Sequence, residues 1–255
     1  MKTMEQTPEQ LELGQKETLL RQRQEVLAEL ELSFSTLQGR LKSFEIEYYF
    51  KVGSKYVQLD QLQATLDKIL ASRIPFDSTA QRKASESEQK ANQSARDAEE
   101  FILEHKDKQK EFHSNPELKS LYRELAKLLH PDLTLDAEEK DRRHHLMQEI
   151  NEAYQAGRIE RLREILEAEK NNPNLIKGDD VGSSLARVIR KIAQVDKRIA
   201  DIEKELEKLH QTELHILMEA VERQMKNGTN LLDKMADELD SSIVFLEGQI
   251  KQVNL

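Results

Sequence analysis

Apolar side chains recur every seventh residue along the first fifty residues of the chain. This repeat is carried by Leu13, Leu20, Leu27, Phe34, Leu41 and Tyr48. A second position between them holds Leu30, Leu37 and Phe44, and earlier Lys16 and Arg23. An average spacing near 3.5 residues is typical of a coiled-coil helix, and the stripe is narrow for a helix buried in a globule. We predict such a helix over residues 9–51; a helix packed on a globular core is the alternative.

The stripe is interrupted once before it ends. Val52-Gly53-Ser54 stands between the first repeat and a second one, which runs through Tyr56, Leu59, Leu62, Leu66 and Ile69 to Pro75. Glycine is a common helix terminator and serine a common helix cap, so the sequence favours a hairpin near residues 52–54. A single helix that bends through Gly53 is the other possibility. We assign residues 1–76 to an N-terminal coiled-coil arm.

The segment that follows is polar. Residues 77–100 offer only alanines at roughly helical spacing. Their pattern indicates a solvated helix or a flexible connector, and we assign residues 77–113 to this polar connector.

The last third of the chain, residues 171–255, predicts a C-terminal coiled-coil arm. Its first stripe has three-four spacing and consists of Leu185, Val188, Ile192, Val195, Ile199, Ile202, Leu206 and Leu209. The phase changes at Glu213, after which the apolar positions up to Leu239 follow an eleven-residue period, which predicts a helix that is nearly straight or slightly right-handed in its supercoil. Gly228 lies inside this stretch as a hinge or a site of close helix approach. Such an arm needs a partner. Either the N-terminal arm pairs with it antiparallel in the same chain, or a second copy does.

Residues 114–170 have a different pattern, that of a small compact domain. Ser114-Asn115-Pro116-Glu117 is a strong helix start, and the helix after it carries a wide leucine-rich face. A second helix begins near Asp136, and a third follows Gly157. The residues expected to form the shared core are Tyr122, Leu125, Leu129, Met147, Ile150 and Tyr154.

A basic row leads to the loop between the first two of these helices. Lys119, Arg123 and Lys127 are spaced by four, so they lie on one side of the helix, and His130 continues the row. Pro131 ends the helix because it cannot donate a backbone hydrogen bond. His130 then stands at the negative end of the helix dipole, which favours the imidazolium form. Asp132 follows in the loop, where its carboxylate is available to an arginine or a backbone donor.

Composition excludes several classes of function. The net charge of −9 argues against nucleic acid as the main partner, and the chain has no cysteine for disulfides or thiolate metal sites. No run of 18 apolar residues predicts a membrane span, and the N-terminus has no apolar signal stretch, so a cytoplasmic location is expected. The histidines show no metal-ligand spacing. No group orients His130 as a base, so neither an enzyme nor a cofactor is expected.

Two segments, YRELAKLLHPD (Tyr122 to Asp132) and QEINEAY (Gln148 to Tyr154), make this region resemble the J-domain of DnaJ-type co-chaperones. The resemblance covers about a fifth of the chain and extends to a bacterial-like subgroup in which coiled coils flank the J-domain. Some features depart from it: a first helix is not recognisable before Ser114, and residues 101–112 are its possible replacement. Leu133 stands where a lysine often follows the aspartate, and Met147 where a phenylalanine is usual.

The resemblance implies an all-α fold in which long coiled-coil helices flank a small helical hairpin with an HPD loop. It also implies a function, which is to bind a DnaK-type seventy-kilodalton heat-shock chaperone and stimulate its ATP hydrolysis. Asp132 would engage an arginine of that partner, His130 and Pro131 would shape the loop, and the basic row would dock on an acidic surface. The arms would bind an unidentified client or mediate assembly, including homo-oligomers.

The alternative is a structural coiled-coil scaffold whose J-like domain lacks chaperone coupling. The co-chaperone hypothesis requires Asp132 and the basic row to be accessible. An Asp132 side chain held inward by a local salt bridge, together with an arm covering the row, would contradict it.

Overall fold

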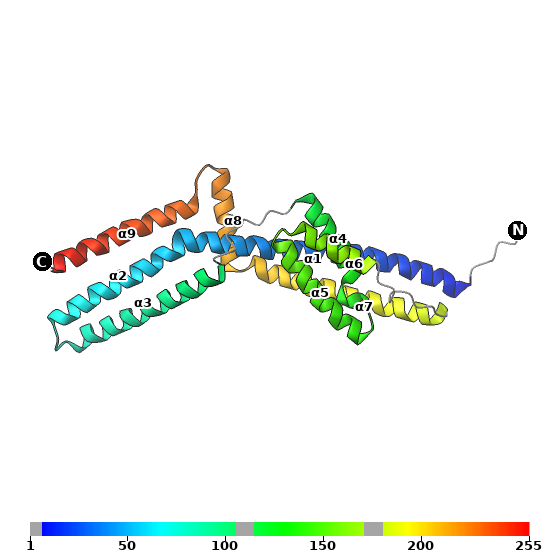
Figure 1. Ribbon diagram of the computed structural model, residues 1–255, viewed down its shortest axis with the longest axis horizontal. Helices are drawn as coiled ribbons and strands as arrows, with labels where there is room; N and C mark the ends of the chain where they lie inside the picture. The colour runs from blue at the N-terminus through cyan, green and yellow to red at the C-terminus, as the bar shows by residue number, and fades with distance from the viewer. Residues whose placement is uncertain (1–6, 106–114, 171–180, 255) are drawn as a thin grey trace. The chain divides into compact units, whose positions relative to one another are not determined.

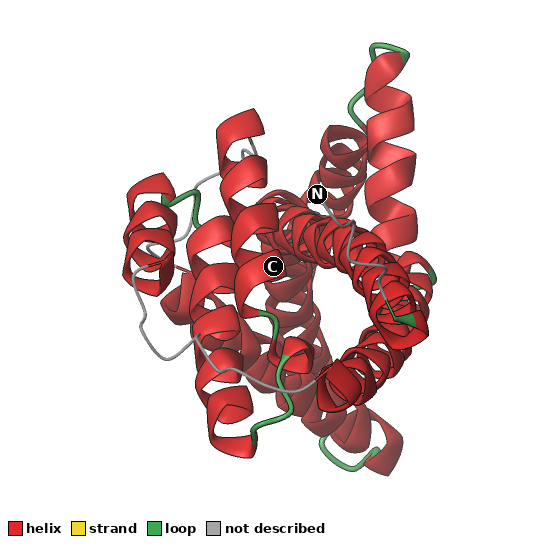
Figure 2. Ribbon diagram, turned by 90° about the vertical axis from the view of Figure 1, so that its right-hand side faces the viewer, coloured by secondary structure: helices red, strands yellow, loops and turns green. Residues whose placement is uncertain are grey.

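The computed structural model describes residues 7–105, 115–170 and 181–254, and every regular element in these ranges is helical (Figures 1 and 2). The elements, in chain order, are α1 Pro8–Tyr48, the π-helix η1 Tyr49–Gly53, α2 Ser54–Arg73, α3 Ser78–His105, α4 Pro116–Leu129, the 3-10 helix η2 Pro131–Leu133, α5 Ala137–Gln155, α6 Ile159–Lys170, α7 Val181–His210, α8 Glu213–Lys226 and α9 Leu231–Asn254. The all-α prediction is therefore confirmed for the described residues. None of the described helices is long and apolar enough to cross a membrane.

The chain divides into two compact units. The first comprises residues 1–40 and 112–212, and the second comprises residues 41–111 and 213–255. Each unit therefore combines an N-terminal part of the chain with a part far along the sequence. The predicted arms do not correspond to these units, because α1 contributes to both and the C-terminal stretch is divided at Thr212.

A small helical core organises the first unit. Helices α4 and α5 are antiparallel, because the Tyr122 and Tyr154 rings meet with centroids 4.7 Å apart while Arg143 reaches the backbone of His130. Helix α6 packs against both. All six residues predicted as core lie in one buried cluster, together with Leu118, Ala126, Ala153, Leu162, Ile165 and Leu166. Ala28 and Leu32 of α1 complete this cluster, so the three short helices do not bury their apolar faces alone.

Side-chain caps account for where these helices begin. The Asn115 side chain accepts a hydrogen bond from the Leu118 amide at 2.7 Å, so Asn115 is the N-cap of α4. The Asp136 carboxylate accepts from the amides of Glu138 and Glu139 and caps α5. Gly157 adopts a φ of +67° just after α5, a conformation that side chains with a Cβ rarely tolerate. Ser114 lies outside the described residues.

Helices α1 and α7 pack side by side in the same unit. Leu27 of α1 and Val195, Ile199 and Ile202 of α7 form a second buried cluster, which also includes Leu133 of the HPD loop. The two helices run in the same direction (Figure 1), and Arg23 meets Asp196 at 3.1 Å. Pairing within one chain was one of the two alternatives, but the expected antiparallel orientation is wrong.

The predicted hairpin at residues 52–54 is also wrong, because the helix continues there through one π-helical turn. Gly53 has the helical dihedrals φ −58° and ψ −43°, and Val52 is fully buried. A Cβ at Gly53 would approach the Tyr49 ring to 3.0 Å. Glycine is thus used here for close packing of an aromatic ring and does not end a helix.

The chain reverses after Pro75 instead, and α3 returns along α2. Lys83 reaches Asp67 at 2.9 Å and Lys90 reaches Asp60 at 2.8 Å. The buried face of α3 consists of Ala91, Ala98 and His105. Residues 78–105 are therefore a helix that packs with one face and exposes most of its other residues, which favours the predicted solvated helix over a flexible connector. Alanines at helical spacing are enough to pack α3 on α2, because small side chains let the two helices approach closely.

Residues 101–105, which were predicted to replace part of the first J-domain helix, belong to α3. Phe101 stacks on Tyr49 with centroids 4.2 Å apart, inside the second unit. It does not join the α4–α5 core, so this replacement is wrong for Phe101; the prediction for Phe112 falls outside the described residues. The place beside α4 is taken by α1.

The expected straight helix between Leu214 and Leu239 is interrupted. Gly228 has a φ of +75°, and the Thr229 amide donates to the Gln224 carbonyl, which is a typical helix-ending turn. Helix α9 then runs parallel to η1 and α2, with Lys51 contacting Asp233 and Lys55 contacting Asp240. Gly228 therefore belongs to a turn between α8 and α9, and because no atom lies within 4 Å of the position of an added Cβ, the alternative of close helix approach is wrong.

The shared core predicts a large stability difference between two isoleucines of the first unit. Ile150→Ala should lower the free energy of unfolding by about 3 kcal/mol, because Ile150 is fully buried. Ile189→Ala is the matched control, because 45% of that side chain is exposed, and it should cost less than about 1 kcal/mol. Chemical denaturation followed by circular dichroism measures both; equal losses would contradict the assignment of the core.

Candidate functional site

The tip of the α4–α5 hairpin carries His130, Pro131 and Asp132. Helix α4 ends at Leu129, and His130 leaves helical geometry with ψ at 130°. The chain then makes one 3-10 turn, in which the Leu133 amide donates to the His130 carbonyl at 3.0 Å. The Asp132 amide donates to Nδ1 of the His130 ring at 3.1 Å. Because Nδ1 accepts this bond, Nε2 is the ring nitrogen that is left to donate.

The His130 side chain is buried against α1 and α7. Its Nε2 atom donates to Oε1 of Glu31 at 2.8 Å, and the same oxygen accepts from Nε of Arg198 at 2.9 Å. Burial by itself would raise the pKa of Glu31, but the hydrogen bond from His130 and the charge of Arg198 together lower it below 4.5. Glu31 therefore remains a carboxylate and links the HPD loop to α1 and α7.

Tyr122 extends this network into the hairpin core. Its hydroxyl donates to Oδ1 of Asn151 at 2.6 Å and lies 3.4 Å from the Glu31 carbonyl. Burial, followed by the charge of Glu31, raises the pKa of Tyr122. The phenol is thus a permanent donor that connects α4, α5 and α1.

Asp132 forms a salt bridge with Lys140, with 3.0 Å between Oδ1 and Nζ. The Asp132 side chain is 19% exposed and that of Lys140 is 40% exposed, so this pair lies at the surface. Because the lysine side of this pair is open to water, the pair contributes only modestly to stability. The carboxylate therefore has a local partner but is not enclosed.

A charged network in the first turns of α5 contacts the backbone of the HPD loop. Arg143 is buried, contacts the His130 carbonyl and binds Glu139 at 2.8 Å. Glu139 also receives two hydrogen bonds from Arg142, which are the main reason that its pKa falls to about 2. Arg142 in turn binds Glu169 of α6. This network links the backbone of the HPD loop to α5 and α6.

The basic row on α4 faces α1. Lys127 contacts Glu25, and Arg123 lies 2.5 Å from Glu29. The Nε–H of Arg123 is not aligned for a hydrogen bond, so this contact is electrostatic. About a third of each cationic side chain is exposed. Lys119 is half-buried and makes no ion pair with any residue that the structure describes. The co-chaperone hypothesis requires the basic row to be accessible, and the side chains of Arg123 and Lys127 are only partly exposed.

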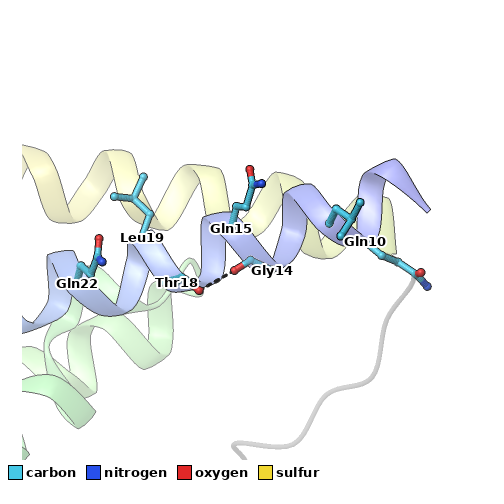
Figure 3. Close-up of a pocket in the computed structure, with 7 residues that line it drawn as sticks. Gln10, Gly14, Gln15, Thr18, Leu19 and Gln22 are labelled. Atoms are coloured by element: carbon cyan, nitrogen blue, oxygen red, sulfur yellow. Dashed lines mark hydrogen bonds between the residues drawn. The ribbon is translucent and has the colours of Figure 1, made fainter. Parts of the chain in front are cut away.

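A groove of about 570 Å³ borders the loop, lined mainly by α5 with His130, Asp132, Glu31 and Arg198 at one side. His144 and His145 also line it, but the described residues contain no group of side chains arranged to hold a metal ion. A second hollow, near the start of α1, is lined by glutamines, leucines, Gly14 and Thr18 (Figure 3). Thr18 donates to the Gly14 carbonyl there. Without ionisable groups this hollow has no evident chemistry.

Reasoning from the sequence did not identify Glu31 and Arg198. They lie 99 residues before and 68 residues after His130, inside stretches from which mainly the apolar positions were interpreted. The available signal was weak: Glu31 stands between Leu30 and Leu32 beside the apolar seam. A carboxylate in that position is more often exposed than buried.

Comparison with known proteins adds no family to this description. No family model matches the chain, and neither a curated protein nor a solved structure matches it. The resemblance to a J-domain therefore depends on the motifs quoted above.

Removing the shared carboxylate should destabilise the first unit. Glu31→Ala leaves the buried His130 donor without a partner and leaves Arg198 with Glu205 alone, so the free energy of unfolding should fall by about 3 kcal/mol. Glu12→Ala is the control, because Glu12 lies exposed on the same helix. Denaturant titration measures both. Equal stabilities of the two variants would show that the network is not formed.

The Glu139 carboxylate predicts a dependence of stability on pH. Its folded pKa of about 2 lies below the unfolded value near 4.5, so its contribution is complete above pH 4.5 and is lost as the pH falls toward 2. Glu139→Gln should cost about 1 kcal/mol at pH 7 and almost nothing at pH 2. Glu138→Gln, at an exposed neighbour, should show no such difference. A gap between wild type and Glu139→Gln that does not narrow in acid would contradict this.

Proposed function

We propose that this chain is a J-domain co-chaperone that recruits a DnaK-type chaperone and stimulates its ATP hydrolysis. The observation that carries the proposal is the placement of His130-Pro131-Asp132 at the tip of an antiparallel helical hairpin, directly after a helix with a basic row. A proline-broken helix end at this position presents a carboxylate and cations within one surface. Such a surface suits an acidic partner that offers an arginine.

The proposed action is allosteric and the chain performs no chemistry itself. Asp132 would exchange its salt bridge with Lys140 for the partner's arginine, an exchange that is inexpensive because both side chains are near the surface. The basic row would orient the two proteins. The partner's hydrolysis-competent state would be favoured by as much as the hairpin binds that state more tightly.

The rigidity of the hairpin supports this role. Tyr122 and Tyr154 are fully buried against each other, and Arg143 holds the loop backbone. A loop fixed in this way keeps the Asp132 carboxylate in a defined position, so that little order is lost when a partner binds.

A structural scaffold is the second candidate, and a specific observation favours it. His130 is buried in a network with Glu31 and Arg198, where it connects α1, the loop and α7. In a scaffold, the role of His130 would be to hold these three elements together. The HPD sequence would then serve to fasten a helical hairpin onto the long helices.

Measurement of ATP turnover by a purified DnaK-type chaperone distinguishes these candidates. A co-chaperone should raise the turnover, and Asp132→Asn should abolish the increase while leaving the fold intact, because the substitution removes only a charge at a partly exposed site. His130→Gln should also abolish it. Asp136→Asn is the control, since asparagine caps helices as well as aspartate does. If neither the wild-type chain nor a variant with a more exposed HPD loop changes the ATP turnover, the scaffold function replaces the co-chaperone function.

The basic row should contribute a salt-dependent part of the affinity for the chaperone. Reversing Lys119, Arg123 and Lys127 to glutamate should weaken binding at low ionic strength and reduce its dependence on salt, because fewer opposite charges meet. Titration calorimetry at two salt concentrations measures this. Unchanged binding would remove the row from the proposed interface.

A further inference from the structure

Helix α1 presents an acidic row to the basic row of α4. Glu25 and Glu29 are four residues apart, as are Arg123 and Lys127, so each pair lies along one side of its helix. Lys127 contacts Glu25 and Arg123 contacts Glu29, which places the two rows in antiparallel register. The same cations are those that the proposed function assigns to the acidic surface of the partner.

The loop is covered by the same helix and by α7. The His130 ring is 3% exposed and bonded to Glu31, which stands two residues after Glu29 on α1. Pro131 is also buried. Of the residues that would engage the chaperone, only Asp132 and the outer parts of the cations remain accessible.

Leu133 provides an apolar contact between the HPD loop and the two helices that cover it, α1 and α7. It is buried in the cluster formed by Leu27 of α1 and by Val195, Ile199 and Ile202 of α7. The resemblance implies a lysine at this position, and a lysine could not enter that cluster without a large desolvation cost. The departure from the family pattern thus coincides with the point where the loop meets the long helices.

We infer that α1, assisted by α7, is an autoinhibitory element. Its Glu25 and Glu29 pair with Lys127 and Arg123, and its buried Glu31 binds His130, in place of the chaperone. This inference rests on the proposed function and concerns the regulation of the same site. The chaperone and α1 compete for the same cations, so the stimulation measured for the chain depends on how often α1 is displaced.

The contacts differ in strength in a way that suits a reversible cover. The Glu25 and Glu29 side chains are 63% and 55% exposed, so their ion pairs contribute modestly and weaken with salt. The Glu31 network is buried and holds more firmly. The outer pairs are therefore the ones to alter in a test, because the core of the unit does not depend on them.

Reversing the acidic row should uncover the site. Glu25→Lys combined with Glu29→Lys should lower the concentration of chain that gives half-maximal stimulation of a DnaK-type ATPase by about fivefold, from the loss of two exposed ion pairs and their replacement by repulsion. The matched control is Glu12→Lys combined with Glu17→Lys. It makes the same change of charge at exposed positions of the same helix, away from α4, and should leave that concentration unchanged.

A crosslink tests the same inference in the opposite direction. The amide groups of Gln38 on α1 and Gln155 on α5 are 3.4 Å apart, and the chain has no other cysteine to compete if both are replaced. In Gln38→Cys combined with Gln155→Cys, a short bismaleimide should fasten α1 to the hairpin and reduce stimulation at least severalfold. Each single-cysteine chain treated with the same reagent is the control and should behave as the wild type does.

The outcomes separate the inference from the function beneath it. Greater stimulation by the reversed row, together with reduced stimulation after crosslinking, supports autoinhibition. If the wild type stimulates the ATPase and neither change alters it, the autoinhibition is overturned while the co-chaperone function stands. If the wild type, the reversed row and the crosslinked chain all leave ATP turnover at its basal value, the proposed function itself fails.

Discussion

One carboxylate oxygen of Glu31 accepts hydrogen bonds from both His130 and Arg198, and the first unit is organised around it. Burying Glu31 and His130 is unfavourable unless each has a partner, so the described packing of α1, the loop and α7 depends on these contacts. The loop between α4 and α5 therefore cannot take its described position without α1 and α7. The neighbouring apolar contacts of Leu27 and Leu133 act in the same direction.

This constraint explains why a short helical hairpin is stable here. The core of α4, α5 and α6 is small, and small cores bury too little apolar surface to offset the loss of chain entropy easily. Ala28 and Leu32 from α1 close one side of it. The helix that stabilises the hairpin is also the helix that covers its basic row, so stability and concealment have a common structural cause.

The second unit uses different means. Between α2 and α3 the packed side chains are small, as at Ala91 and Ala98, and ion pairs such as Lys90 with Asp60 lie at the margins. Residues 49–53 form one π-helical turn, in which Gly53 leaves room for the Tyr49 ring. These choices leave little trace in a pattern of large apolar residues, which is why the segment after Pro75 was expected to be solvated.

The sequence by itself determined the helical character of the described chain, the beginning and end of α4 and α5, and the residues that fill the hairpin core. These features depend on contacts between residues close in the chain: caps at Asn115 and Asp136, a proline at position 131, and apolar residues at helical spacing. Periodicity also indicated that α1 and α7 each carry a seam, because one seam can be read from one helix.

Only the tertiary structure decided which seams meet, in which direction, and what they cover. Parallel and antiparallel pairs of helices use the same apolar stripe, so the stripe alone does not predict the parallel orientation of α1 and α7, in which Arg23 meets Asp196. The pairing of Glu31 with His130 joins residues 99 positions apart. No local pattern records such a contact, because its free energy arises only after the surrounding helices have excluded water.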